Sequence, residues 1–338
     1  MVDKPSAKDV PSAVVLELTY RCNNSCLFCS CPWESDEDFK QEELSLDEWK
    51  TIVDGVVSLG VTSITLTGGE PLMRPDISDI IEYLGKCETI THRRIITNGL
   101  LLSEEMLALL KKHDFAFSTS LPGIKSYRKH TGNKGSKQVL HWIGRAHKHG
   151  LATTTGITVT KLNQSELYET MSHALLAGSD TILLNRFLPG GRGLKHRKQL
   201  ELNRAEVNSM LQTAEKVLLL SKRTGSLGTE VPYCAIDNSE QYKQLRIGYI
   251  CSAAKGFFVV DPSGHVRVCN HSPVRVGTLD NFSENAYWHA FRQRAYIPAS
   301  CVLCEKVNFC DAGCREAASI CNGSISAPDP ILQEHLQK

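Results

Sequence analysis

The stretch Cys22-Asn23-Asn24-Ser25-Cys26-Leu27-Phe28-Cys29 places three cysteines within eight residues, and an aromatic residue directly precedes the last of them. Thiolates are the usual ligands of iron–sulfur clusters, and four of them saturate one cluster. Three thiolates on one loop leave an iron without a protein ligand, so a small molecule can coordinate there. A zinc site is the alternative, with Cys31 as its fourth ligand.

A second motif follows the next strand-like run of the chain. The cysteine loop comes after the apolar run 14–18, and the run 63–67 ends in Gly68-Gly69-Glu70-Pro71. Adjacent glycines let backbone approach a ligand closely, and a glutamate accepts hydrogen bonds from an ammonium group. Together the cysteine triad and this motif resemble the radical S-adenosylmethionine (radical SAM) family.

The composition indicates in which compartment the protein works and which classes of partner it lacks. The 338 residues carry a formal charge of +1, with charged residues well mixed, which argues against a nucleic-acid partner. The apolar runs are too short to span a membrane, and the polar N-terminus is no signal peptide. Thirteen cysteines in such a chain indicate metal binding or catalysis rather than disulfides, and we expect a cytoplasmic protein.

The first two thirds of the chain alternate strand-like runs with amphipathic helices. Alternation of this kind predicts a parallel sheet, and parallel α/β folds place ligands at the carboxyl ends of their strands. An open doubly wound sheet would also explain it, but the family resemblance favours a partial (β/α)6 TIM-like barrel. We expect a lead-in over residues 1–12, the barrel over 13–224 and a small cysteine-rich domain over 225–338. The expected strands are 14–18, 63–67, 94–97, 115–120, 154–160 and 181–185.

The C-terminal third has its own cysteine pattern. Cys251 is separated from Gly264 by twelve residues, and four further residues lead to Cys269; the run Cys301-x2-Cys304-x5-Cys310-x3-Cys314 follows, and then Cys321. This spacing resembles the SPASM extension of radical SAM enzymes, named for subtilosin, pyrroloquinoline quinone, anaerobic sulfatase and mycofactocin maturation. A structural zinc ribbon is the alternative.

The resemblance implies three 4Fe–4S clusters. One would be held by Cys22, Cys26 and Cys29 and would bind SAM. Two auxiliary clusters would be held by a proximal set of Cys251, Cys269 and Cys314 and a distal set of Cys301, Cys304, Cys310 and Cys321. Cys234 is the candidate fourth ligand of the proximal set. Cys31 lies beside the triad, and Cys31 and Cys234 are also candidate hydrogen donors to a substrate radical, whereas Cys87 is expected to pack in the core.

The same resemblance assigns a SAM pocket. Gly68, Gly69 and Glu70 would hold the SAM amine, and Phe28 would lie near the adenine. Ser120 and Arg128 match positions that bind the ribose and carboxylate; the alternative for Arg128 is a solvated loop residue. Relatives carry Ser-Leu-Asp-Gly after the fourth strand, whereas this chain has Pro122 in place of the aspartate.

The segment after the sixth strand, 186–193, reads Arg-Phe-Leu-Pro-Gly-Gly-Arg-Gly. It is similar to a segment in several SPASM relatives, including enzymes of tetrapyrrole synthesis. Leu188 is therefore assigned to the cofactor pocket, and Arg186 and Arg192 would face an anionic group. The alternative is a turn that links two domains.

Three functions remain open. By resemblance, the first is a radical SAM oxidoreductase that cleaves SAM to a 5′-deoxyadenosyl radical, abstracts a substrate hydrogen and oxidises or cross-links a peptide or protein side chain. The second is such an enzyme acting on a small molecule, for example a tetrapyrrole. The third, a protein that only stores clusters, conflicts with the intact SAM motifs. Expected partners are an electron donor such as flavodoxin or ferredoxin and a separate leader-peptide-binding protein.

Overall fold

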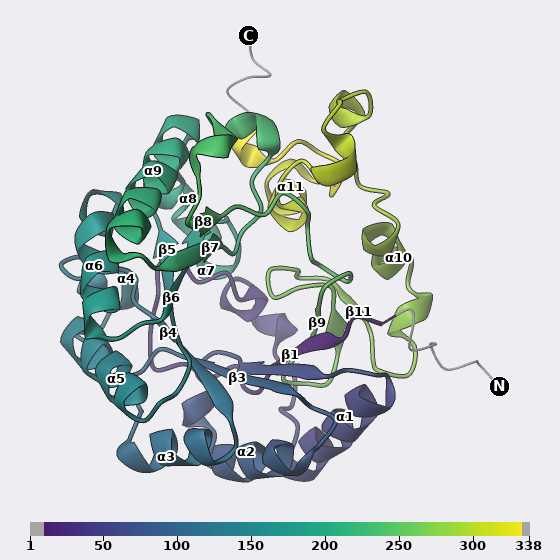
Figure 1. The fold of residues 1–338 in the computed structure, drawn as a ribbon. Helices are drawn as coiled ribbons and strands as arrows, with labels where there is room; N and C mark the ends of the chain where they lie inside the picture. Colours follow the sequence, from purple (N-terminus) through teal and green to yellow (C-terminus); the bar gives the residue numbers. More distant parts are fainter. Residues whose placement is uncertain (1–9, 333–338) are drawn as a thin grey trace.

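One sheet, parallel over most of its width, organises the chain (Figure 1). The computed structural model describes residues 10–332. Eleven strands of this part form the sheet, in the order β11-β10-β9-β1-β2-β3-β4-β5-β6-β7-β8. The strands β1 to β8 are each parallel to the next; they are Ala13–Glu17, Ser63–Thr67, His92–Thr97, Phe115–Ser120, Thr153–Val159, Thr181–Arg186, Thr224–Leu227 and Leu245–Arg246.

Helices cover the outer face of this sheet and form an arc around it in Figure 1. Strands β1 to β8 follow one another across the sheet in sequence order. A doubly wound sheet would reverse its strand order at one point, so this order matches a barrel and excludes the doubly wound alternative. No hydrogen-bonded ladder joins the ends of the sheet among the described residues, so the expected partial α/β barrel is confirmed. The outer helices are α1 Leu46–Ser58, α2 Ile77–Lys86, α3 Glu104–Lys112, α5 Ser136–Lys148, α6 Leu167–Ala177 and α9 Arg204–Ser221.

Local sequence explains where these helices begin. The Ser45 side chain accepts a hydrogen bond from the Glu48 amide, and the Glu48 carboxylate accepts one from the Ser45 amide, which together form a capping box. Ser103 caps α3 in the same sense, and Asn203 forms a second capping box with Glu206. None of the helices in residues 10–332 is long and apolar enough to cross a membrane.

The C-terminal part continues the sheet at both of its ends. Gly225 lies inside β7, so the sheet runs through the expected domain boundary. At the other end β9 (Phe258–Val260) pairs in parallel with β1, and β10 (Val266–Arg267) and β11 (Arg275–Gly277) follow as antiparallel strands. Of the expected lead-in, residues 1–9 lie outside the described residues and Val10 is buried.

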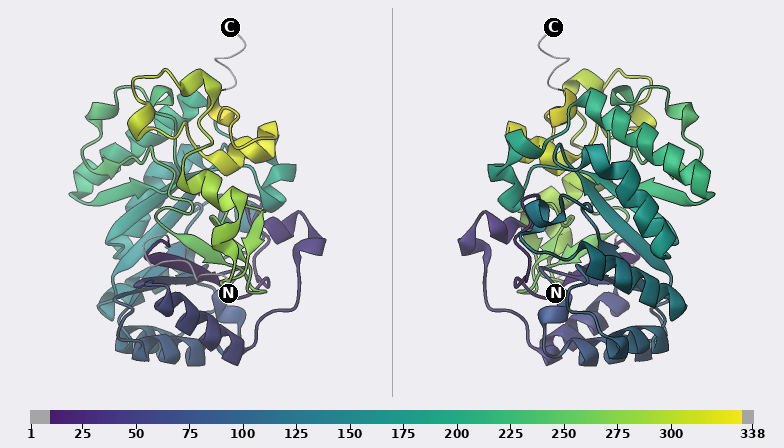
Figure 2. Two further views of the ribbon diagram at one scale, coloured as in Figure 1. Left: turned by 90° about the vertical axis from the view of Figure 1, so that its right-hand side faces the viewer. Right: turned by 90° about the vertical axis from the view of Figure 1, so that its left-hand side faces the viewer.

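The side views show the C-terminal helices α10 (Ala286–Arg292) and α11 (Arg315–Asn322) gathered on one side and toward one end of the molecule (Figure 2). In Figure 1 this part occupies the side of the ring that the helical arc leaves open. The C-terminal part therefore covers the opening of the partial barrel.

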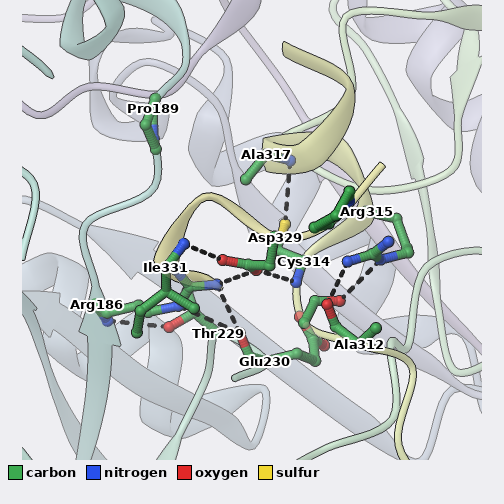
Figure 3. A network of polar contacts seen from close by, with 12 residues as sticks. Arg186, Pro189, Thr229, Glu230, Ala312, Cys314, Arg315, Ala317, Asp329 and Ile331 are labelled. Carbon is green, nitrogen blue, oxygen red and sulfur yellow. Dashed lines mark hydrogen bonds and ion pairs between the residues drawn. The ribbon is translucent and has the colours of Figure 1, made fainter. Parts of the chain in front are cut away.

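Two buried ion pairs attach the C-terminal part to the barrel. Glu17, the last residue of β1, pairs with Arg267 of β10, and both side chains are fully buried. Arg186, the last residue of β6, pairs with Asp329 at 2.5 Å, and Asp329 also accepts hydrogen bonds from the Cys314 and Ile331 amides (Figure 3). Each pair joins the carboxyl end of a barrel strand to a segment more than 140 residues away in sequence.

Removing one partner of the Glu17–Arg267 pair is expected to destabilise the protein. The substitution Arg267→Met leaves a buried carboxylate without its counter-charge, which costs about 3–5 kcal/mol of unfolding free energy. The double variant Glu17→Gln/Arg267→Met removes both charges and should recover much of that loss. Denaturant unfolding of the anaerobically purified full-length protein measures both.

The matched control is Lys112→Met, which breaks the exposed pair with Glu82. It should change the unfolding free energy by less than about 1 kcal/mol. An Arg267→Met variant as stable as this control would show that the buried pair does not hold the C-terminal part to the barrel.

Candidate active site

A single cavity of about 440 Å³ lies at the carboxyl ends of the parallel strands. Residues from the cysteine loop, from the Gly-Gly-Glu motif and from the cysteine-rich C-terminal part line it together. The cysteines in its wall are Cys22, Cys26, Cys29, Cys31, Cys251, Cys269 and Cys314. The structure thus brings the triad and the three cysteines of the expected proximal set to one space.

The cysteine loop is held from one side by the short helix α4 (Tyr127–Thr131) and the residues after it. The Ser25 and Leu27 amides donate to the Thr131 and His130 carbonyls at 2.9 and 2.8 Å. The Asn133 side chain donates to the Asn23 carbonyl and to the Asn24 side chain at 2.7 and 2.6 Å. These hydrogen bonds, two from backbone amides and two from the Asn133 side chain, fix the path of the loop between its cysteines.

The two glycines after β2 hold the loop from the other side. The Gly69 amide donates to the Thr19 carbonyl at 2.7 Å, and the Glu70 amide donates to the Arg21 carbonyl at 2.8 Å. A Cβ on Gly68 would lie 2.7 Å from the Thr19 oxygen, and one on Gly69 would lie 2.3 Å from the Arg21 oxygen. The close approach expected of these glycines is therefore made to the strand that leads into the cysteine triad, while both glycines also line the cavity.

Glu70 is fully buried beside this contact. Its carboxylate accepts hydrogen bonds from the Thr97 hydroxyl and the Asn98 amide, both at 2.7 Å, and from the Leu72 amide at 3.1 Å. Burial raises the pKa of Glu70 to about 7, although the three donors act in the opposite direction. The carboxylate ties the end of β2 to the end of β3 and lines the cavity.

The glycine-rich segment after β6 packs beneath the cysteine loop. The Gly193 amide donates to the Cys29 carbonyl at 2.9 Å, and a Cβ on Gly191 would lie 2.3 Å from the Cys31 oxygen. Gly191 has a φ of +47°, in the left-handed region that favours glycine. The segment is therefore a support for the cysteine loop rather than a simple linking turn.

The two arginines that bound this segment have partners within the protein. Arg186 pairs with Asp329 and donates to the Glu230 carbonyl, as Figure 3 shows. Arg192 pairs with Glu34 and donates to the Cys26 carbonyl at 3.2 Å. Arg186 lines the cavity, but the guanidinium groups of both arginines already pair with carboxylates and carbonyls of the chain itself, so the structure gives no support to an anionic ligand at these residues.

The structure brings most of the expected SAM-pocket residues to the cavity. Phe28, Ser120 and Leu188 line it, and Pro122 lies in the same wall. Arg128 does not, because it lies on the exposed side of α4, whereas Tyr127 and Thr131 of the same helix face the cavity. The structure therefore does not support Arg128 as a pocket residue and favours its alternative as a solvated side chain.

Polar residues at strand ends complete the wall, and sequence reasoning did not single them out. Asn98, Thr158 and Asn185 lie at or just beyond the ends of β3, β5 and β6. Their position at the carboxyl ends of predicted strands was the available signal. Glu230, His271 and Glu316 also line the cavity, but they belong to the C-terminal part, where no strand register could be predicted.

The ionisation of the triad's thiols is consistent with their being ligands of an iron–sulfur cluster. Burial raises the pKa of Cys22 to about 11 and that of Cys26 further, and neighbouring thiols of the triad add to the shift in both. The Cys31 thiol, which hydrogen-bonds to Cys29, lowers the pKa of Cys29. The raised pKa values favour the protonated thiols at Cys22 and Cys26, and a bound metal cluster supplies the positive charge that lets them ionise.

The C-terminal cysteines fall into two neighbourhoods. Burial raises the pKa of Cys314 to about 12 and also raises the pKa of Cys251 and Cys269; in Cys269 the charge of Glu316 adds to it. Cys234 is exposed and lies outside the cavity wall. Cys87, at the end of α2, packs against the core as expected.

No three His, Cys, Asp or Glu side chains within residues 10–332 form a ready site for a single metal ion. A cluster binds each thiolate to a different iron, so its cysteines stand further apart than the ligands of one ion. The assignment of clusters therefore depends on cysteine spacing, on burial and on the shared cavity.

Comparison with known proteins agrees with this arrangement. Residues 16–174 match the Radical SAM superfamily. The chain is 25% identical over 344 residues to the PqqA peptide cyclase of Gluconobacter oxydans (strain 621H), covering 95% of this chain and 90% of that protein. It is 26% identical over 351 residues to the AdoMet-dependent heme synthase of Methanosarcina barkeri (strain Fusaro / DSM 804), covering 95% and 96%.

Among solved structures, native anSMEcpe with bound AdoMet and Cp18Cys peptide is similar in fold. The TM-score is 0.72 at 15% sequence identity, and the match covers 96% of this chain and 94% of that one. At this identity the likeness concerns the fold.

The backbone contact at Gly69 predicts a specific loss. The substitution Gly69→Ala forces the Arg21 backbone away, so the cysteine loop shifts and the triad is expected to lose most of its bound iron and all SAM cleavage. Iron content and 5′-deoxyadenosine formation in anaerobically reconstituted protein measure this.

Gly248→Ala is the matched control, because a Cβ at Gly248 meets no atom within 4 Å. It should retain iron and SAM cleavage at the level of the unmodified protein. Full iron and SAM cleavage in the Gly69→Ala variant would contradict the role given to this contact.

Proposed function

Because this chain carries a radical SAM domain and is an enzyme of that type, we propose that it oxidises or cross-links a side chain of a peptide substrate. One observation carries the proposal: the triad Cys22, Cys26 and Cys29 and three C-terminal cysteines line the same cavity. A substrate in that cavity has a hydrogen-abstracting centre on one side and an electron acceptor on the other.

SAM and one 4Fe–4S cluster are the cofactors of the radical SAM domain. We assign this cluster to Cys22, Cys26 and Cys29. The finer assignment is that the C-terminal part holds two auxiliary clusters, a proximal one at Cys251, Cys269 and Cys314 and a distal one at Cys301, Cys304, Cys310 and Cys321. When bound, SAM and its cluster supply the one-electron chemistry that removes a hydrogen atom from the substrate.

The chain's own residues would bind SAM, orient it and shield the reaction from water. Gly68, Gly69 and Glu70 are proposed to hold the SAM amine, with the carboxylate held in place by Thr97 and Asn98. Phe28 and Leu188 supply apolar wall, and Ser120 supplies a hydroxyl at the end of β4. The C-terminal part covers the open side of the barrel, which keeps water from reactive intermediates.

Relatives support a peptide substrate. The relative named PqqA peptide cyclase spans nearly the whole chain, and the anSMEcpe structure has a bound peptide. The electron donor, flavodoxin or ferredoxin, and a separate leader-peptide-binding protein remain part of the proposal.

A small-molecule substrate is the second candidate, supported by the relative named AdoMet-dependent heme synthase. The sequence argument for it was an anion site at Arg186 and Arg192. Both guanidinium groups have partners in the chain, so this argument is weakened.

SAM affinity should depend on pH through Glu70. The folded-state pKa of about 7 is above the usual value, so below it the carboxyl group is protonated and cannot pair with the SAM ammonium. We expect SAM affinity to fall about tenfold per pH unit below that value and to level off above it. Equilibrium SAM binding to the cluster-loaded protein measures the profile.

The substitution Glu70→Gln should weaken SAM binding at neutral pH and flatten this profile. The exposed carboxylate variant Glu42→Gln should keep both the affinity and the profile. An unchanged pH profile in Glu70→Gln would remove Glu70 from the SAM site.

The proposed reaction is tested with reduced holoenzyme, SAM and short candidate peptides. We expect a product two hydrogens lighter than the peptide, and 5′-deoxyadenosine in near-equal amount, because SAM is consumed once per turnover. Deuterium at the reacting carbon should appear in 5′-deoxyadenosine. Protein with Cys22, Cys26 and Cys29 changed to alanine should form neither product.

Recovery of intact SAM, or a product with solvent hydrogen at the reacting carbon, would contradict net oxidation. Cys31 and Cys234 would then be tested as hydrogen donors by alanine substitution. Turnover of a tetrapyrrole but of no peptide would favour the second candidate.

A further inference from the structure

A buried carboxylate beside the proximal cysteines has an oxygen without a partner. Glu316 lies in the first turn of α11 and is only 1% exposed. Its Oε1 accepts a hydrogen bond from the Tyr287 hydroxyl at 3.0 Å. Its Oε2 is buried and has no hydrogen-bond partner in the described part of the chain, although the Ser272 hydroxyl approaches the carboxyl group.

This carboxylate faces the same space as the proximal cysteines. Glu316, Cys251, Cys269 and Cys314 all line the cavity. Glu316 follows Cys314 by two residues, and Cys314 caps the helix on which Glu316 lies. Burying a carboxylate oxygen without a partner is costly, and a bound cation removes that cost.

Cys234 and Cys321, the two cysteines that could complete the proximal set, lie outside the cavity. The amide of Tyr233, next to Cys234, donates to the Cys310 sulfur at 3.4 Å, which places Cys234 with the distal set. Cys321 is at the other end of α11, seven residues from Cys314, which is about 10 Å along the helix axis. Neither residue lines the cavity.

Other polar groups near the proximal cysteines are already engaged. The His271 Nε2 is 2.9 Å from the Pro189 carbonyl oxygen, and the Glu230 Oε1 accepts from the Ser252 amide. Among the C-terminal residues described in this wall, Glu316 Oε2 is the buried side-chain oxygen without a hydrogen-bond partner; the other unpartnered oxygen of the cavity, the Tyr127 hydroxyl, lies on α4 of the barrel.

We propose that Glu316 is the fourth protein ligand of the proximal auxiliary cluster, in place of a fourth cysteine. The inference rests on the proposed three-cluster content. A carboxylate donates less electron density than a thiolate, and replacing thiolate ligands by weaker donors raises the reduction potential of a cluster. The proximal cluster would therefore accept an electron from an oxidised substrate more readily than an all-thiolate cluster would.

The test compares full-length, anaerobically reconstituted protein with the variants Glu316→Gln and Glu316→Cys. Iron content, electron paramagnetic resonance and redox titration are the readouts, so no substrate is required. Glu316→Gln should lose about one iron per chain and show a three-iron signal when oxidised, because an amide is a poor ligand. Glu316→Cys should keep its iron, with a lower midpoint potential for one cluster.

Glu230→Gln is the matched control, a second carboxylate in the same wall, and should keep the iron content and the signal of the proximal cluster. Cys234→Ser should leave the proximal signal unchanged. The proposal is overturned if both Glu316 variants keep the spectra, potentials and iron content of the unmodified protein, or if Cys234→Ser alters the proximal signal. Should Glu316→Gln fail to fold, a Glu316→Cys variant with unchanged potentials overturns the proposal by itself.

The same measurements distinguish an error in the three-cluster content from an error in the ligand proposal. Unmodified protein that binds iron only at the triad has no auxiliary clusters, which refutes the three-cluster content itself. Unmodified protein with three clusters whose proximal signal ignores Glu316 refutes the ligand proposal alone.

Discussion

The site depends on a backbone contact that leaves no room for a side chain. The segment Thr19–Arg21, between β1 and the cysteine triad, and the turn Gly68–Glu70 are joined by two amide-to-carbonyl hydrogen bonds. A Cβ on either glycine would collide with the Thr19 or Arg21 carbonyl. This contact sets the position of the cysteine loop relative to Glu70, which in turn joins the ends of β2 and β3. The glycines of 190–193 make a similar contact beneath the loop, so glycine backbone supports the cysteines on two sides.

The second constraint is the attachment of the C-terminal part to the barrel. Glu17–Arg267 acts at β1 and Arg186–Asp329 at β6, so the cover is fixed at two separated strands. Buried pairs of this kind contribute little net stability, but they oppose any arrangement that leaves one charge unpaired. Asp329 also binds the Cys314 amide, so the second pair positions a cysteine of the cavity wall directly (Figure 3). The relative placement of the two cysteine sets follows from these contacts.

Local sequence predicted the elements with strong signals. The alternation of runs gave the first six strands to within about two residues, because strand and helix periodicities differ so clearly. The helix starts at Ser45, Ser103 and Asn203 followed from side-chain capping. The strands β7 and β8 have four and two residues and few apolar side chains, so their pairing depends on the preceding strand and left no pattern to find.

Site residues that belong to motifs with a fixed spacing could be predicted from the sequence. Site residues whose position depends on the packing of distant segments could not. The triad and the Gly-Gly-Glu motif lie at the ends of β1 and β2, as parallel strands require. The direction of Arg128 depends on the phase of a five-residue helix, and the partners of Arg186 and Arg192 depend on segments distant in sequence. The neighbours of Cys234 and Glu316 likewise follow only from the packing of the C-terminal part.

We propose that a SAM-binding centre near the N-terminus and an electron-accepting centre in the C-terminal part face one cavity. Iron-edge anomalous diffraction from crystals grown without oxygen tests it most directly. The account predicts three iron sites per chain, two of them bordering the cavity, at Cys22–Cys26–Cys29 and at Cys251–Cys269–Cys314. Iron at the triad alone, or a zinc edge at the C-terminal cysteines, would contradict it.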